Sequence, residues 1–309
     1  MFNGSCSSAP CFNEPNSNYG NTTIALGNLL NSYPQFSGDF EGLALEKASS
    51  WYNAMQIRFQ KRTTHNVSFE GSYTISKATD NSSAGRNNWV GTLGSGLPQQ
   101  LDRLYLEHSI SANDAPQRLA LAVVVELPVG RKQWIGGDMN RILNGAVGGW
   151  SLATIITEQS GLPMAIGMSS PQLANGTQRP NVVCPQLKTG LSMDTVARNW
   201  QTAGNQGSPA FLNASCFGDP GDQNPGNAPR YFSSLRVNGI HNVDMNIYKS
   251  FVPREGMKLD VRAEMFNFFN HPRFGQPNSS VGDPAFGTIN SDGGGYTPRA
   301  FQFGLRFEF

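Results

Sequence analysis

The chain has 309 residues, which suffice for one large domain or two small ones, and its formal net charge of +1 gives no reason to expect a nucleic-acid partner. Charged residues make up only 15% of the chain, whereas soluble proteins usually carry about 25%. No apolar run reaches the ~18 residues of a membrane helix, so a helical membrane protein is not expected. The scarcity of charge raises the question of what the outer surface of the protein faces, since a soluble surface usually needs charged residues.

Apolar and polar residues alternate with a period of two along the chain, the pattern of β-strands that have one apolar and one polar face. Within residues 66–76, for example, Val67, Phe69 and Tyr73 alternate with polar side chains. The alternation predicts about seven strands, at residues 53–60, 66–76, 118–127, 150–159, 241–250, 258–267 and 301–309. Strands of roughly ten residues exceed the usual length of about five or six and match the ~9–11 residues that cross an outer membrane.

Shorter and longer connections alternate between these strands. Links of a few residues follow the first and the fifth strand, and a moderate link follows the third. The other connections are long and rich in Gly, Asn, Ser and Pro, and they occupy residues 77–117, 161–240 and 268–298. Outer-membrane barrels have short periplasmic turns and longer external loops. The sequence therefore predicts an all-β fold, an antiparallel up-and-down transmembrane β-barrel segment with long extracellular loops and a last strand that ends at the periplasm.

A soluble antiparallel sheet is the main alternative, because its strands also alternate when one face packs on a core. Such a domain should have connections of about 4–6 residues at both ends of its sheets and charged outward faces. The polar faces here instead mix Ser, Thr and Gln with Arg, Glu, Asp and Lys, as a wet lumen would. No amphipathic helix is expected between the strands, which excludes folds that alternate helices with a parallel sheet.

The charged residues of the polar faces are expected to point into the lumen, because an arginine at the lipid midplane costs ~2–4 kcal/mol. These residues, whose expected role is pairing with neighbouring strands first and substrate contact second, are Arg58, Glu70, Arg262, Glu264 and Arg306. Aromatic and cationic residues of the long loops could bind a ligand, although most external loop residues are simply solvated. The candidate loop residues are Arg86, Trp89, Trp200 and Arg230.

The four cysteines form two local pairs, Cys6 with Cys11 and Cys184 with Cys216, each within a Gly/Asn/Pro/Ser-rich segment. Four cysteines permit three pairings, and the sequence alone does not choose among them. Local pairing in an oxidising compartment is the preferred interpretation, because it would restrain the long loops. The sequence has no CxxC motif and no histidine at a suitable spacing near the cysteines, so a zinc site is not expected.

Motifs of catalysis are missing from the sequence: it has no nucleophile elbow, P-loop, zinc-protease helix or dinucleotide fingerprint. The four histidines, His65, His108, His241 and His271, are scattered over different predicted segments. We therefore predict no catalytic residue, cofactor or metal site, and we expect that the chain is not an enzyme.

Several blocks of the sequence resemble TonB-dependent receptors of the branch with an Oar-like barrel. The most specific block is RAEMFNFFNHP at 262–272, which follows HNVDM at 241–245 and precedes Phe274-Gly275. The other matching blocks are YPQF at 33–36, SWYNAMQ at 50–56, GSYTISK at 71–77, GGWSL at 148–152, QSGLP at 159–163 and RPN at 179–181. The resemblance spans most of the chain from Tyr33 to Phe309, although the two long external loops match only in scattered residues.

The resemblance implies a transporter barrel of about 22 strands whose lumen holds an N-terminal plug. It implies that bulky or scarce ligands are taken up with energy from the TonB complex of the inner membrane. The end of the chain is similar to the signal that the barrel-assembly machinery recognises. The residues of this expected assembly signal are Phe301, Phe303, Leu305, Phe307 and Phe309.

The chain departs from this family in what it lacks: a signal peptide, a plug, a TonB-contacting box and about two thirds of the strands. We therefore expect a C-terminal fragment, with an extracellular loop region at 1–50 and barrel strands at 51–309. The expected partners are outer-membrane lipid, the barrel-assembly machinery, an unidentified extracellular ligand and, only through the missing plug, the TonB complex. Two alternatives stay open, a passive porin or adhesin barrel and a secreted soluble β-domain that binds carbohydrate.

Overall fold

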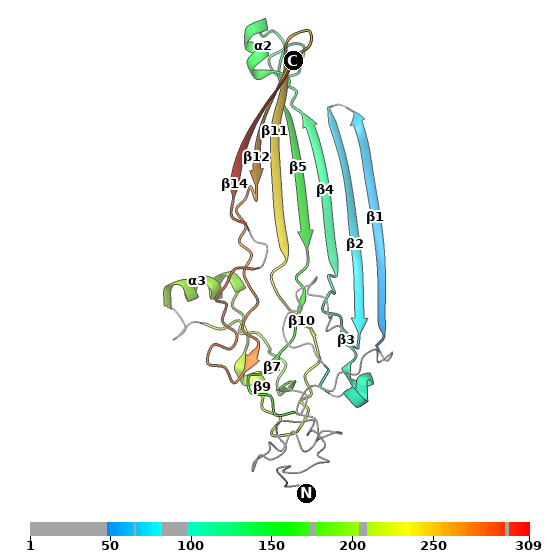
Figure 1. The fold of residues 1–309 in the computed structure, drawn as a ribbon, viewed down its shortest axis with the longest axis vertical. Helices are drawn as coiled ribbons and strands as arrows, with labels where there is room; N and C mark the ends of the chain where they lie inside the picture. The colour runs from blue at the N-terminus through cyan, green and yellow to red at the C-terminus, as the bar shows by residue number, and fades with distance from the viewer. Residues whose placement is uncertain are drawn as a thin grey trace, which may run out of the picture.

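The computed structural model describes residues 48–64, 66–81, 98–99, 101–173, 177–203, 209–293 and 297–309. One long antiparallel sheet dominates it, with small links at one end and the long loops at the other (Figure 1). The long strands are β1 (Ser50–Thr64), β2 (Val67–Asp80), β4 (Gln117–Glu126), β5 (Ser151–Gln159), β11 (Ile240–Arg254), β12 (Met257–Phe266) and β14 (Ala300–Glu308). The predicted loop region at 1–50 lies almost wholly outside the described residues.

Each long strand pairs with the next one in the chain, because the order in the sheet is β1-β2-β4-β5-β11-β12-β14. The short strand β3 (Ser109–Ile110) adds to the end of β2. The predicted up-and-down arrangement is therefore confirmed. Three strands are longer than predicted: β1 and β11 have 15 residues each and β2 has 14.

The register of the sheet places most of the large apolar side chains on one face, because directly paired residues of antiparallel strands point the same way. Val124, Ile155 and Phe266 are exceptions that lie on the other face. Aligned rows on this apolar face are Ile57–Tyr73–Leu119, Leu121–Ile156–Val243 and Met245–Met265–Phe301. Rows on the opposite, polar face are Gln56–Thr74–Arg118 and Asn246–Glu264–Gln302. Many side chains of the apolar face, Met55 and Leu305 among them, are exposed. The apolar face of the sheet is therefore not covered by a hydrophobic core of the described residues.

The connections at one end of the sheet are shorter than those at the other end, as predicted. Asn66, with a φ of 63°, stands at the turn before β2, and Gly256, with a φ of 83°, forms the turn before β12. Residues 127–150 join β4 to β5 and contain the helix α2 (Arg141–Val147), whose first turn is capped by the Asn140 side chain. The sequence analysis did not predict this short helix, which forms where the link folds on itself instead of crossing directly.

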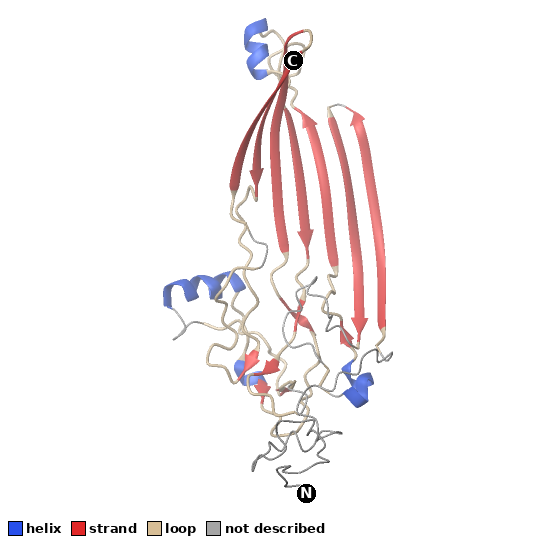
Figure 2. Cartoon of the chain, in the orientation of Figure 1, coloured by secondary structure: helices blue, strands red, loops and turns tan. Residues whose placement is uncertain are grey.

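The long connections meet at the other end of the sheet and fold together (Figure 2). Their elements are η1 (Leu101–Glu107), β6 (Pro163–Met164), β7 (Gly167–Met168), β8 (Asn181–Val182), α3 (Met193–Ala203), η2 (Ala214–Cys216), β9 (Phe217–Gly218), β10 (Phe232–Arg236) and β13 (Ser280–Val281). β6 pairs with β10 and β8 with β9, while β7 pairs with β13 from the following long connection. The two connections are thereby tied to each other.

The hydrophobic core of the chain lies among these loops. Ile166, Leu212 and Leu235 are fully buried in it, and Phe217 packs edge-on against Phe232 and Phe286. The helix α3, which the sequence analysis did not predict, adds Met193, Val196 and Ala197 to the same core. The buried positions are spaced by three and four residues, as the inner face of an amphipathic helix requires. The loops therefore form a folded cap with its own core.

No helix in the described ranges is long and apolar enough to span a membrane.

Candidate functional site

The charged residues predicted for the lumen all lie on the polar face of the sheet, and each of them forms an ion pair on that face. Arg58 of β1 pairs with Glu70 of β2 across the first two strands. Arg262 lies 3.6 Å from Glu264, and Arg306 lies 2.7 Å from Glu308, in each case two residues along the same strand. These pairs are exposed to solvent, where each contributes about 0–1 kcal/mol. Their effect is therefore to line the polar face with alternating charge and not to stabilise it greatly.

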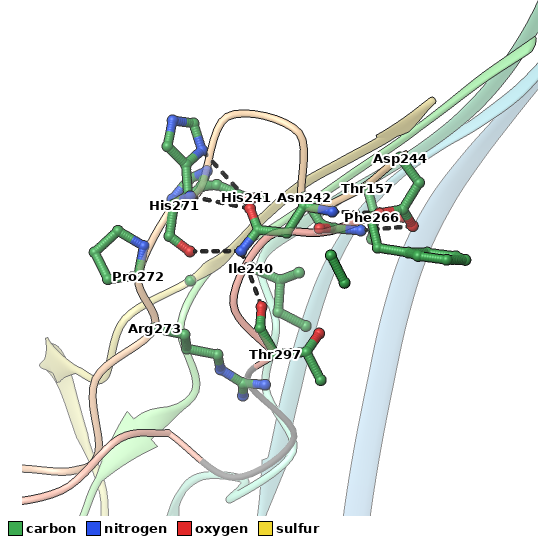
Figure 3. A pocket seen from close by; sticks show the side chains of 13 residues that line it. Thr157, Ile240, His241, Asn242, Asp244, Phe266, His271, Pro272, Arg273 and Thr297 are labelled. Atoms are coloured by element: carbon green, nitrogen blue, oxygen red, sulfur yellow. Dashed lines mark hydrogen bonds between the residues drawn. The ribbon is translucent and has the colours of Figure 1, made fainter. Parts of the chain in front are cut away.

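A pocket of about 530 Å³ opens on the polar side of the sheet where the strands meet the loops (Figure 3). The first residues of β11, the end of β12 and the start of β14 surround it. Its polar lining includes Thr157, Asn242, Asp244, His271 and Thr297. The pocket is therefore built where three neighbouring strands leave the sheet.

Asn267 organises this pocket from a buried position directly after β12. Its backbone has a φ of 46°, a left-handed conformation that asparagine tolerates better than most residues. Its side-chain Nδ2 donates to the carbonyls of His271 (3.2 Å) and Thr297 (3.1 Å), and its Oδ1 accepts from the His271 N–H (2.9 Å). One side chain thus fixes the two walls of the pocket.

Asp244 is held in the same network from the neighbouring strand. Its Oδ1 accepts from the backbone N–H of Asn267 (2.9 Å) and its Oδ2 from the side chain of Asn242 (2.9 Å). Residues from 241–245 and from 262–272, the two blocks that carry the resemblance best, therefore meet in one hydrogen-bonded structure. Their side chains define the shape of the strand ends.

Two histidines stand at the edge of this pocket. The imidazole of His241 pairs with the carboxylate of Glu158 on β5. His271 lies with its Nδ1 at 3.4 Å from the His241 carbonyl and stacks on the ring of Phe269. The pocket thus offers imidazole, amide and carboxylate groups to a solute. Within the described residues, no group of three or more His, Cys, Asp and Glu side chains could hold a metal ion.

Arg230, expected as a ligand-binding loop residue, is instead buried, with 1% of its surface exposed. Its guanidinium pairs with the Asp80 side chain, donates to the Asp80 carbonyl at 2.8 Å and donates to the Glu107 carbonyl at 3.1 Å. The side chain therefore joins the end of β2 to the loop cap and cannot reach an external ligand.

Two more arginines of the connection between β5 and β11 bind carboxylates of the connection between β2 and β4. Arg179 Nη1 lies 2.5 Å from Glu107 Oε2, and Arg236 Nη2 lies 2.6 Å from Asp114 Oδ2. The acid of each pair is almost fully buried. Together with Arg230, these pairs lock the two connections into one body.

Most of the remaining predicted loop residues and cysteines lie outside the part of the chain that the structure describes. Arg86 and Trp89 lie outside the described residues, as do Cys6 and Cys11. Trp200 belongs to α3, but its side chain is also outside the description. Cys184 and Cys216 are joined by a disulfide within the loop cap, and Cys216 is buried.

The last long connection contains a tight turn closed by Asp283. The backbone N–H of Ala285 donates to the Asp283 carboxylate at 2.7 Å, and the side chain of Asn278 donates to it at 3.1 Å. These two hydrogen bonds stabilise the ionised form, so the pKa of Asp283 lies below its ordinary value. The turn brings Phe286 into the loop core.

The expected assembly-signal residues lie on the apolar face of β14 and just beyond its end, and all of them are exposed: Phe301, Phe303, Leu305, Phe307 and Phe309. Among the described residues, the strand pairs on one side only, with β12.

The chain matches the model of a family described as the outer membrane beta barrel domain, over residues 5–302. A comparison with curated protein sequences finds no match. Among solved structures, the chain is similar to the outer membrane transporter YddB from Escherichia coli, with 8% sequence identity and a TM-score of 0.37. That similarity covers 84% of this chain and 25% of the transporter, so the chain spans about a quarter of that protein's length. In an outer-membrane barrel the apolar side of each strand faces lipid, which assigns the exposed apolar face of this sheet to the lipid side. The chain belongs to the outer membrane beta barrel domain family.

Proposed function

We propose that the chain is the C-terminal part of the barrel of a TonB-dependent receptor, of the Oar-like branch, that takes up a bulky solute. The observation that carries the proposal is the open sheet. Its outer strands, β1 and β14, each pair on one side only within the part of the chain that the structure describes. A free strand edge in lipid would leave a row of backbone N–H and C=O groups without partners, which is prohibitively costly. The strands therefore require a larger barrel, and barrels of about 22 strands are the plugged transporters.

Solute capture in this proposal begins at the loop cap. The arginine–carboxylate pairs and the loop core hold the cap in one arrangement, so little conformational freedom is lost when a solute binds. The pocket at the strand ends, with Asn242, Asp244 and His271 at its wall, offers hydrogen-bonding groups at the entrance to the lumen. The alternating charges of the polar face continue from there toward the periplasm. Energy for passage would come from the TonB complex, acting through a plug domain of the complete receptor.

A passive porin or adhesin is the second candidate, because the same polar face could line an open pore. The secreted soluble β-domain is set aside, since the family is one of outer-membrane barrels. No catalytic role is proposed for any residue.

The two candidates differ in conductance and in their need for energy. We would reconstitute the complete barrel protein that contains this chain into planar lipid bilayers. A plugged receptor is expected to show almost no steady conductance until denaturant extracts the plug, whereas a porin conducts at once. In cells, solute uptake should be saturable and should stop when the TonB complex is deleted. Steady open channels together with uptake that survives this deletion would overturn the proposal.

A further inference from the structure

The link between β4 and β5, residues 127–150, is called the foot below. It is a folded unit: the Ile135 N–H donates to the Pro128 carbonyl at 3.0 Å, and the Gly130 N–H donates to the Ile135 carbonyl at 2.9 Å. The side chain of Asn144 in α2 accepts from the Arg131 N–H at 2.5 Å, which ties the helix to the start of the link. The foot therefore holds a fixed shape beside the C-terminus, at the end of the sheet opposite the long loops, which the alternation of short and long connections predicts to be periplasmic (Figure 1).

Large apolar side chains of the foot are exposed. Trp134 and Ile142 each have 88% of their surface exposed, and Ile135, Leu143 and Val147 are also exposed. Single exposed apolar residues are common on proteins, whereas several within one short segment indicate a surface that contacts a protein or a membrane.

Lys249 shows on which side of the sheet the foot lies. It pairs with Val261 in the register of β11 and β12, so it belongs to the lipid-facing row between Ile247 and Phe251. Its ammonium nevertheless donates to the carbonyl of Gly145 in α2, and it lies 4.4 Å from the centre of the Phe251 ring. The helix α2 is therefore placed against the apolar, lipid-facing side of the strands.

The charge of the foot fits the same position. It carries Arg131, Lys132 and Arg141 against the single acid Asp138, a net charge of +2 from three cations and one anion. Tryptophan together with lysine and arginine is the usual composition of a segment at the membrane interface. Positive charge beside an apolar surface favours anionic phospholipid headgroups.

We propose that the foot is a membrane anchor that inserts Trp134 and Ile142 into the periplasmic leaflet and binds anionic phospholipid through its basic residues. A lipid surface is favoured over a periplasmic protein because the foot continues the lipid-facing face of the sheet directly. This inference rests on the family and its lipid-facing face, and it does not depend on the proposed transport activity.

The test uses the complete barrel protein that contains this chain, refolded into phosphatidylcholine vesicles with and without phosphatidylglycerol. The fluorescence of Trp134 is obtained as the difference between the wild type and Trp134→Phe. Bromine-labelled acyl chains should quench most of this difference signal, and iodide present on both sides of the membrane should quench little of it. Removing two cations with Lys132→Gln and Arg141→Gln should abolish the extra quenching that phosphatidylglycerol gives, whereas Lys188→Gln in the loop cap should not.

The opposite pattern would overturn the proposal. If iodide quenches the Trp134 signal as it quenches a hydrated tryptophan and brominated lipid has no effect, the foot faces water and its apolar surface suits a periplasmic protein. If Trp134→Phe does not refold, Ile142→Trp reports on the same surface as an added signal, with the same two outcomes.

Discussion

Replacing Arg230 with methionine should loosen the loop cap far more than the loss of an exposed arginine would. The guanidinium makes three described hydrogen bonds, to the carboxylate of Asp80, to the Asp80 backbone carbonyl and to the Glu107 backbone carbonyl. Methionine can make none of them. The Asp80 carboxylate, which is 9% exposed, would stay buried without this partner. Breaking a buried pair by removing one side costs about 3–5 kcal/mol. At about 1.4 kcal/mol per factor of ten, local opening would become roughly 100-fold to several thousand-fold more frequent.

Hydrogen exchange of the backbone amides in β10 measures this opening in the folded barrel, because β10 directly follows Arg230 and belongs to the cap. Arg198→Met is the matched control, since Arg198 forms an exposed pair with Asp194 one helical turn away. That pair is worth less than about 0.5 kcal/mol. Equal exchange rates in the two variants would refute the reasoning that the buried pair locks the loops.

Three further perturbations test other parts of the structure. Val123→Arg places a charge on the lipid-facing face, at a cost of ~2–4 kcal/mol near the midplane, and should reduce the yield of folding into bilayers. The control Ala122→Arg, on the polar face, should fold normally. Equal yields for the two variants would show that the faces are misassigned. Hydrogen bonds hold the pKa of Asp283 below its ordinary 3.8, so the Asp283 carboxylate stabilises the turn fully above pH 3.8, and this stabilisation is lost as the pH falls through the lower pKa of the folded state. Amide exchange in the turn should rise in that acidic range, and Asp283→Asn should remove the pH dependence. The disulfide Cys184–Cys216 closes a loop with a sequence separation of 32, and its reduction should destabilise the cap by about 2–4 kcal/mol. Protease digestion of the cap should then become faster, while amide exchange in the long strands stays unchanged. Digestion that is unaffected by reductant would contradict this.

The strands could be predicted from the sequence because their pattern is local. Each strand must present apolar side chains to lipid and polar ones to the lumen, so a few neighbouring residues suffice to show both the strand and its facing. The ends of β1, β2 and β11 extend beyond the alternating segments, because backbone pairing continues where the side chains no longer alternate between apolar and polar.

The cap could not be predicted in this way, since its contacts are between distant residues. Arg230 and Asp80 are separated by 150 residues, and nothing near Arg230 in the sequence distinguishes a buried arginine from a solvated one. The helix α3 did leave a local signal, because Met193, Val196 and Ala197 have helical spacing. The signal covers little more than one turn, which is too short to separate from a polar loop.

The role of Asn267 has a partial signal in the sequence. Two asparagines within NFFNHP stand at the end of a predicted strand: Asn267 is its last residue and Asn270 lies three residues beyond, and both adopt a positive φ. Asparagine is enriched at such positions, so the end of β12 is visible in the sequence. The network that reaches Asp244 and Thr297 is not, because it joins three separate strand ends.

The facing of the strands is the central claim, and spin labels placed singly along β4, from Gln117 to Glu126, test it most directly. The complete barrel protein in vesicles would be measured for collision with oxygen, which concentrates in lipid, and with a water-soluble nickel reagent. We predict that oxygen accessibility peaks at Leu119, Leu121, Val123 and Val125, and that nickel accessibility peaks at the residues between them. Accessibility without this alternation, or with the two reagents exchanged, would contradict the assignment of the lipid-facing and lumen faces.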